Sequence, residues 1–128
     1  MTGSSKRKGD RAELEVQAML REHLGVPARR ALGAGRKDDV GDITGVPNTV
    51  VQVADWKEVA RAVREKPLEA EEQRLNTYQS DFASLVSRYE FVPPRCVDHA
   101  ATFIRLRGGD YRVVLTPEQW FALWREAQ

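Results

Sequence analysis

The chain has little cysteine and no long apolar run. Its 128 residues include a single cysteine, Cys96, which excludes an internal disulfide bond and fits a reducing cytosol. No apolar run approaches the roughly 18 residues of a membrane-spanning helix, so we expect no membrane partner. The first residues, MTGSSKRKGDRAE, are basic without an apolar stretch, which argues against a secretory signal. These absences predict a cytoplasmic protein.

Histidine is also scarce, which weakens the one pattern that resembles a zinc site. Cys96 and His99 have the spacing of a pair of zinc ligands. The only other histidine is His23, and the chain offers no second pair of ligands. We therefore do not expect zinc.

Length and composition indicate one globular domain. Hydrophobic residues make up 41% of the chain and charged residues 30%, which are ordinary values for a soluble protein. A chain of 128 residues is long enough to bury a core, and it contains no internal repeat. We expect residues 1–9 to form a basic, flexible N-terminal tail and residues 10–128 to form a single domain.

The net charge is only +1, but it is unevenly distributed. Residues 1–37 contain nine Lys or Arg against four acidic residues, a net charge of +5, whereas residues 38–128 have a net charge of −4. A basic first third suits a protein that binds phosphate with one surface, although a solvated terminus would give the same pattern. The residues that we predict to contact DNA are Lys6, Arg7, Lys8, Arg11, Arg29, Arg30, Arg36 and Lys37.

Hydrophobic periodicity and turn residues predict the element order α-β-β-β-α-β-β-α. Trp120 and Trp124 share one side of the last helix and are expected in the core. The pattern predicts an α/β fold with a single mixed β-sheet flanked by helices. The expected helices cover 10–24, a segment within 57–88 that Pro67 breaks or kinks, and the residues after the cap Thr116-Pro117; the expected strands are 28–32, 41–44, 49–56, 101–107 and 111–115.

The stretch DDVGDITGVPNTVVQVADWK, residues 38–57, contains the main candidate site. Asp42 ends one expected strand, and Gln52 lies on the next strand, on the face it shares with Val50 and Ala54. Asp55 falls on the opposite face by strand alternation, unless a bulge turns it.

Each candidate residue also has a purely structural interpretation. Asp42 after a glycine is typical of a turn cap, and Glu13 on the first helix could be a surface residue. Gln52 lies on an otherwise apolar strand, where an unpaired amide costs about 1–3 kcal/mol. It must therefore have a partner, which is either a structural hydrogen bond or a functional site.

Three stretches resemble the PD-(D/E)xK nuclease superfamily, specifically the Holliday-junction-resolvase-like nucleases of actinobacterial phages. KGDRAELE is similar to the opening of the first helix of that family, with Glu13 at the helical acid. DDVGDITGVPNTVVQV is similar to the two strands of the metal site, with Asp42 at the expected aspartate. RLRGGDYRVVLTPEQW resembles the closing hairpin and helix. The resemblance covers most of the chain outside residues 80–100 and implies a restriction-endonuclease-like fold.

The second metal-site strand departs from the family pattern. The family has Glu-x-Lys there, and this chain has Gln52 and Ala54. Lys57 lies three residues later and is our candidate for a relocated lysine. Gln73 and Tyr78 on the long helix resemble helical Gln and Tyr residues of exonuclease-like members, although a solvated helix face is the simpler interpretation.

The resemblance implies a metal-dependent DNA endonuclease that acts on branched DNA, such as Holliday junctions, during phage recombination or genome processing. The implied cofactor is Mg²⁺ or Mn²⁺, held by Glu13, Asp42 and Gln52, with Lys57 completing the catalytic set. The implied partners are DNA and a second copy of the chain in a homodimer, in the host cytoplasm. The alternative is a catalytically weakened or inactive protein of the nuclease fold that has a DNA-binding or regulatory function, because Gln52 and Ala54 replace the usual Glu and Lys.

Overall fold

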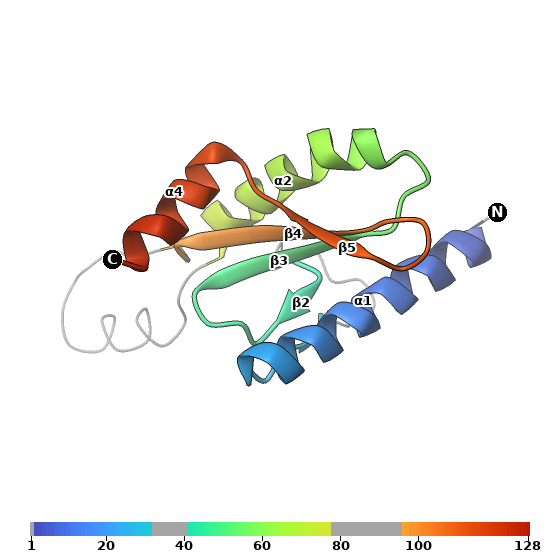
Figure 1. The fold of residues 1–128 in the computed structure, drawn as a ribbon, viewed down its shortest axis with the longest axis horizontal. Coiled ribbons are helices and arrows are strands. Elements are labelled where there is room, and N and C mark those ends of the chain that lie inside the picture. Colours follow the sequence, from blue (N-terminus) through green and yellow to red (C-terminus); the bar gives the residue numbers. More distant parts are fainter. Residues whose placement is uncertain (1, 32–40, 78–95) are drawn as a thin grey trace.

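The elements of the fold follow the predicted order. The structure, a computed structural model, describes residues 2–31, 41–77 and 96–128, with side chains from Lys8 onward (Figure 1). The elements are α1 (Thr2–Leu24), β1 (Arg29–Arg30), β2 (Ile43–Thr44), β3 (Thr49–Ala54), α2 (Val59–Asn76), β4 (His99–Arg105), β5 (Tyr111–Val114) and α4 (Pro117–Glu126).

The strands form one mixed five-stranded sheet in the order β1-β2-β3-β4-β5, which confirms the predicted class. The central pair β3 and β4 is parallel, from Thr49 opposite His99 to Ala54 opposite Ile104. The other three pairs are antiparallel. A parallel pair needs a long crossover connection, and α2 provides it. Most strands are one to three residues shorter at their ends than predicted.

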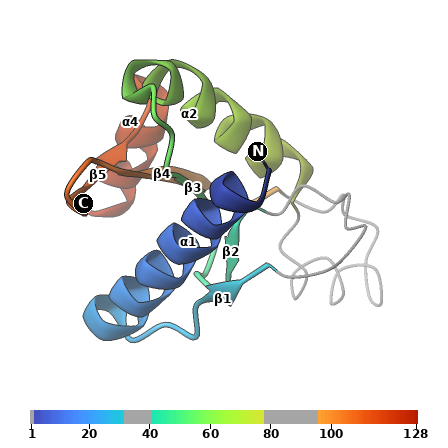
Figure 2. The same ribbon diagram turned by 90° about the vertical axis from the view of Figure 1, so that its right-hand side faces the viewer.

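Strand β3 is buried on both faces, and each face contacts different helices. On one side Val51 and Val53 belong to a cluster with Ala12 and Val16 of α1. On the other side lie α2 and α4, as the two views in Figures 1 and 2 show. The predicted alternation along β3 is therefore confirmed, and the Gln52 side of the strand faces α2.

Helix α1 is longer than predicted. It begins at Thr2, eight residues before the expected start at residue 10, so it includes most of the segment for which we expected a flexible tail. The buried positions Ala12, Val16 and Leu20 lie from the middle of the helix onward. Hydrophobic periodicity therefore had nothing to detect in the first turns, which project beyond the sheet (Figure 1).

Proline does not end helix α2. Pro67 lies inside one helix that runs from Val59 to Asn76, where we predicted a break or a kink within residues 57–88. Its ring is buried, and its carbonyl oxygen accepts a hydrogen bond from Gln119 Nε2 at 3.2 Å. At Pro67, helix α2 therefore contacts helix α4 through this hydrogen bond. The part of the predicted helix after Thr77 lies outside the described residues.

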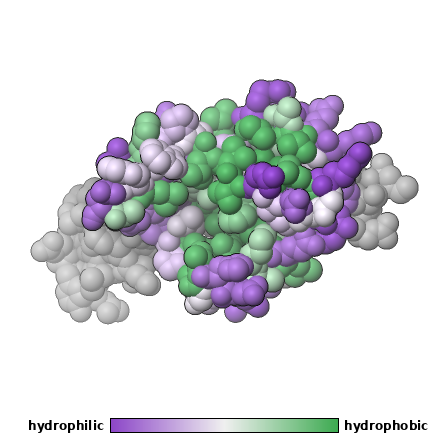
Figure 3. Space-filling view, in the orientation of Figure 1, coloured by the Kyte–Doolittle hydropathy of each residue, from purple (hydrophilic) through white to green (hydrophobic). Residues whose placement is uncertain are grey.

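Helix α4 begins as predicted, but its aromatic side chains are not in the core. Thr116 and Gln119 form a reciprocal capping box, and Gln119 is also the buried residue of the helix. Trp120 and Trp124 are each 52% exposed, so their expected core position is wrong. Apolar surface is visible in the middle of this face of the molecule, over β4 and β5 (Figure 3). The side of α4 that faces α2 carries the polar Gln119, so the side that carries the two tryptophans is exposed to solvent.

None of the helices among the described residues combines the length and the apolar character needed to cross a membrane.

Two glycines give a matched test of the turn that leads from α1 into the sheet. Both Gly25 and Gly45 have positive φ, but only at Gly45 would a Cβ overlap another atom, the Pro27 carbonyl oxygen at 2.1 Å. Gly25→Ala should cost about 1–2 kcal/mol of unfolding free energy from its backbone conformation alone. Gly45→Ala should lose a further ~1–3 kcal/mol from the overlap. Urea denaturation of both variants measures this difference, and equal losses would contradict the close approach.

Candidate functional site

The carboxylate of Asp42 is held by the backbone of β3. The Asp42 N–H donates to the Val51 carbonyl at 2.8 Å, and Asp42 Oδ2 accepts from the Val53 N–H at 2.8 Å. Gly41 makes this approach possible, because a Cβ there would lie 2.8 Å from the Val51 oxygen. Asp42 thus contacts the two residues that flank Gln52.

In the part of the chain that the structure describes, the side-chain amide of Gln52 has a partner for its nitrogen and none for its oxygen. The side chain is almost fully buried, with 1% exposed. Its Nε2 donates to Gln73 Oε1 on α2, whereas its Oε1 has no hydrogen-bond partner within the described ranges 2–31, 41–77 and 96–128. Gln73 therefore does not lie on a solvated helix face, contrary to the simpler interpretation of the sequence. Tyr78 lies outside the described residues.

Glu13 approaches the site from α1. Its Oε1 accepts from Arg30 Nε at 3.0 Å, and Arg30 also pairs with Asp10 at 2.5 Å. Burial raises the pKa of Glu13 above its ordinary value, the bond from Arg30 opposes this, and the negative charge of Asp42 raises the pKa further. The two carboxyl groups therefore lie close enough to repel one another.

Two charged residues of α2, Lys66 and Glu69, also act on the pKa of Asp42. Burial raises the pKa of Asp42, while the Val53 N–H bond and the charge of Lys66 lower it and the charge of Glu69 raises it. Lys57, the candidate relocated lysine, is not among these groups and is exposed after the end of β3. Sequence reasoning missed Lys66 and Glu69, because only the packing of α2 places them near Asp42.

The donor atoms suit a hard cation. Asp42 and Glu13 contribute carboxylates, and the unpaired Gln52 Oε1 is a buried neutral oxygen; Mg²⁺ and Mn²⁺ prefer such oxygen donors. Among the described residues, no group of three or more His, Cys, Asp or Glu is placed to hold a metal ion. The candidate metal ligands are therefore Gln52 and the two carboxylates of Glu13 and Asp42, and the charge of Asp42 raises the pKa of Glu13.

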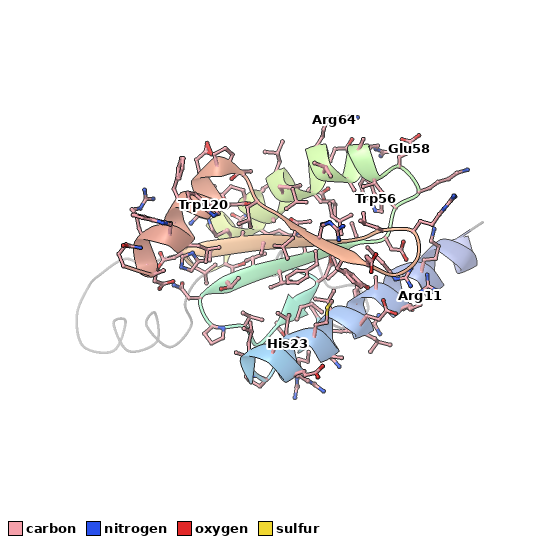
Figure 4. The ribbon with its side chains drawn as sticks, viewed as in Figure 1. Arg11, His23, Trp56, Glu58, Arg64 and Trp120 are labelled. Atoms are coloured by element: carbon pink, nitrogen blue, oxygen red, sulfur yellow. The ribbon has the colours of Figure 1, made fainter. Side chains whose placement is uncertain are left out.

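A cleft of about 630 Å³ opens at the end of β3, and Val53 and Ala54 line it on the strand side. Trp56 lies in its wall, with the Arg61 guanidinium 5.1 Å and Lys66 Nζ 5.6 Å from the centre of the indole ring. Figure 4 shows Trp56 and Arg11 at the same end of the molecule, where α1, the hairpin β4–β5 and the start of α2 meet. The other lining residues are Lys8, Gly9, Asp55, Lys57 and Glu58.

Asp55 lies on the α1 side of the sheet, as strand alternation predicted. Its carboxylate is 3.4 Å from Arg11 and 3.8 Å from Arg105. Arg105 also donates to Glu15 at 2.9 Å. Asp55 therefore belongs to an ion-pair network with α1 and β4 and is not beside Gln52.

The residues predicted to bind DNA have different surroundings. Lys8 lines the cleft, and the exposed Arg29 lines a second groove of about 560 Å³ between α1 and β1. Arg30 is largely buried, and Asp10 and Glu13 neutralise its charge. The side chains of Lys6 and Arg7 lie outside the description, as do residues 36 and 37.

Cys96 and His99 have separate partners. His99 Nε2 is 2.5 Å from Glu126 Oε2 of α4. Cys96 Sγ accepts from Arg74 at 3.6 Å. The spacing that resembles a zinc pair is used here for contacts with two different helices.

Comparisons with family models, with curated proteins and with solved structures found no match.

The buried position of Asp42 predicts a pH-dependent stability. Its raised pKa means that the folded state holds the neutral carboxyl more readily than the unfolded state does. The contribution of the neutral Asp42 carboxyl to the free energy of unfolding is fully present below its ordinary pKa of 3.8. It is lost as the pH rises through the pKa of Asp42 in the folded state. Asp42→Asn keeps an acceptor for the Val53 N–H without the charge, so at pH 7 it should be more stable than the natural protein.

The stability gap between Asp42→Asn and the natural protein should shrink on acidification toward pH 4. Urea denaturation at both pH values measures it, with Glu72→Gln on the exposed side of α2 as the control for loss of a carboxylate. An Asp42→Asn variant that is less stable at pH 7 would show that its charge stabilises the fold.

Proposed function

We propose that this protein is a metal-dependent endonuclease that cuts branched DNA, such as four-way junctions, during phage recombination or genome processing in the host cytoplasm. One observation carries the proposal: the half-buried carboxylate of Asp42 accepts from the backbone N–H of Val53, and the residue before it, Gln52, has a buried side-chain oxygen without a hydrogen-bond partner among the described residues. Evolution retains a charge and an unsatisfied amide in a core, which cost stability, where they serve a site. The resemblance of the Asp42 stretch to PD-(D/E)xK nucleases supports the same chemistry.

In this proposal Asp42, Gln52 and Glu13 hold Mg²⁺ or Mn²⁺. The bound metal would polarise the scissile phosphate and lower the pKa of an attacking water. The chain's own contribution is to fix the oxygen donors: the β3 backbone orients Asp42, and the Arg30 guanidinium orients Glu13. Substrate phosphates then enter at the cleft, where Lys8 and Arg61 supply positive charge.

The proposal includes a homodimer, because resolving a junction requires two symmetrical cuts. The surface best suited to a second copy is formed by edge strand β5 and the apolar side of α4. Among the described strands β5 pairs with β4 alone, and Val113 on it is about half exposed, as are Trp120 and Trp124 of α4. Unpaired edges next to apolar surface are common in protein interfaces.

A second candidate is a nuclease-fold protein that binds or regulates DNA without cutting it. Two observations favour it: Gln52 replaces a carboxylate, and the described residues lack a cluster of three metal-binding side chains. Both candidates share the basic grooves and differ only in cleavage.

Cleavage of a labelled four-way junction with Mg²⁺ or Mn²⁺, beside a linear duplex of the same sequence, tests the proposal. The natural protein should cut the junction in two paired positions, and Asp42→Asn should lose cleavage while it keeps junction binding in Ca²⁺. Removing a ligand from a metal site eliminates the charge stabilisation that drives the reaction, so we expect a loss of at least ~10²-fold. Binding without any cleavage would favour the second candidate, and single unpaired cuts would contradict the dimer.

Salt dependence tests the DNA-binding groove. Arg29→Ala should weaken junction binding and reduce the slope of log K against log salt by about 0.9, because one phosphate contact is lost. Arg64→Ala removes the same charge from an exposed position of α2 that points away from the sheet (Figure 4), and its slope should match that of the natural protein. Equal slopes for Arg29→Ala and the natural protein would exclude the groove beside β1 from DNA binding.

A further inference from the structure

We propose that the cleft at the end of β3 binds an unpaired nucleotide of DNA. Its base stacks on Trp56 and Arg61, which together we name the stacking platform, and its phosphates are held by Lys8 and Lys57. The inference rests on the proposed action on branched DNA. It narrows the substrate class to branched DNA with unpaired nucleotides at the branch.

The first member of the stacking platform, Trp56, has a fixed position between β3 and α2. Its side chain packs against the buried cluster of Ala54, Ala62 and Ile104, and part of it remains exposed. Trp56 also lines the cleft, whose volume of about 630 Å³ lies within the roughly 300–1,000 Å³ of small-ligand sites. An aromatic ring held in the wall of such a cleft is a surface on which a base can stack.

The second member, Arg61, lies on the side of the indole ring that faces the cleft. Two cations lie against the ring, Arg61 at 5.1 Å and Lys66 at 5.6 Å from its centre. The Arg61 side chain lines the cleft and is 54% exposed, whereas Lys66 is 13% exposed and pairs with Glu69 at 3.6 Å. A guanidinium over an indole offers the kind of planar surface on which unpaired bases stack.

The Arg61 guanidinium has donors left for a ligand. Within the residues that the structure describes, it donates through Nε alone, to Glu65 Oε2 at 3.1 Å. That pair is exposed on both sides, so it holds the guanidinium weakly. The terminal N–H groups of Arg61 can therefore bind a phosphate beside the stacked base.

Two lysines from different elements supply further charge for phosphates. Lys8 belongs to α1 and Lys57 follows β3, and both line the cleft. Neither forms an ion pair with another residue in the ranges 2–31, 41–77 and 96–128. The carboxylate of Asp55 in the cleft wall is neutralised by Arg11 and Arg105. The charge of the two lysines is therefore available to a bound anion.

The combination of charge and planar surface identifies the ligand. With Asp55 neutralised, the described lining residues hold three cations, Lys8, Lys57 and Arg61, against the single carboxylate of Glu58. Positive charge favours an anion and the stacking platform favours a planar ring, and a nucleotide has both. A base inside a duplex is already stacked on its neighbours, so the nucleotide that enters the cleft must be unpaired.

Binding of a short single strand in the absence of metal tests the stacking. The probes are an oligothymidine strand and an abasic strand of the same length and charge, each labelled for fluorescence anisotropy in EDTA. The natural protein should bind oligothymidine at least ~10-fold more tightly, because stacking on an aromatic side chain adds about that factor per base. Equal affinity for the two strands would overturn the proposal.

Three variants locate the preference for bases. Trp56→Leu, which keeps an apolar side chain against the Ala54 cluster, should bind the two strands equally. Arg61→Ala changes an exposed member of the stacking platform and should reduce the preference without disturbing the core. Arg64→Ala is the matched control, because it removes the same group from the outer side of α2 (Figure 4) and should keep the natural preference. A natural preference in both Trp56→Leu and Arg61→Ala would exclude the stacking platform.

The emission of Trp56 gives an independent measurement. The chain has three tryptophans, so Trp120→Phe combined with Trp124→Phe leaves Trp56 as the only indole and keeps an aromatic ring at both positions of α4. Saturating oligothymidine should quench this emission, because a base then lies against the ring, and the abasic strand should not. Unchanged emission with oligothymidine bound would refute stacking at Trp56.

The phosphate contacts have their own test. Lys57→Ala should weaken the binding of both strands equally and reduce the slope of log K against log salt by about 0.7, the value for one phosphate of a single strand. An unchanged slope would show that Lys57 does not contact phosphate.

The nuclease function and the nucleotide site fail in different experiments. A four-way junction with unpaired thymidines at the branch should bind at least ~10-fold more tightly than a fully paired junction. A natural protein that cuts junctions in Mg²⁺ but binds these two junctions equally, and the two single strands equally, would refute only the nucleotide site. A natural protein that prefers oligothymidine through Trp56 but cuts no branched DNA would support the nucleotide site and refute the nuclease function.

Discussion

The burial of strand β3 on both faces is the constraint on which the other elements depend. Its parallel partner β4 can be reached only by a long crossover, and this connection places α2 on one face while α1 covers the other. Both helices present alanines where they approach the strand, so the layers lie close together. Any polar group on β3 is consequently enclosed, and its partners must come from α2, α1 or the end of β2.

That enclosure explains the electrostatics of the candidate site. The Asp42 carboxylate takes the place of a strand neighbour by accepting the Val53 N–H, yet burial still raises its pKa. The unpaired oxygen of Gln52 costs about 1–3 kcal/mol by the usual measure for a buried acceptor. A carboxylate held against the backbone of β3 and an unpaired oxygen on β3 itself both lower the stability of the folded chain. The proposed metal site rests on these two features.

The charge asymmetry of the sequence also has a different meaning in the folded chain. Much of the positive charge is neutralised locally: Arg30 pairs with Asp10 and Glu13, and Arg105 pairs with Glu15 and Asp55. Other basic side chains line two grooves, among them Lys8 at the end of β3 and Arg29 beside β1. A count of charges along the chain finds the basic region, but only the ion pairs show which arginines are free to bind phosphate.

The sequence by itself determined the order of the elements, the two faces of β3 and the start of α4. These features depend on local rules, namely alternation along a strand, apolar spacing along a helix and the capping preference of Thr116. It also identified Gln52 as a candidate, because a polar residue on an apolar strand is visible without a structure, and it identified Asp42 and Glu13 through their match to the family motif. Tertiary structure decided the rest. The docking of the helices decides which side of α4 is buried and how α2 continues through Pro67. It also brings the charges of Lys66 and Glu69 to bear on the pKa of Asp42. Docking joins residues more than twenty positions apart, and no local pattern records it.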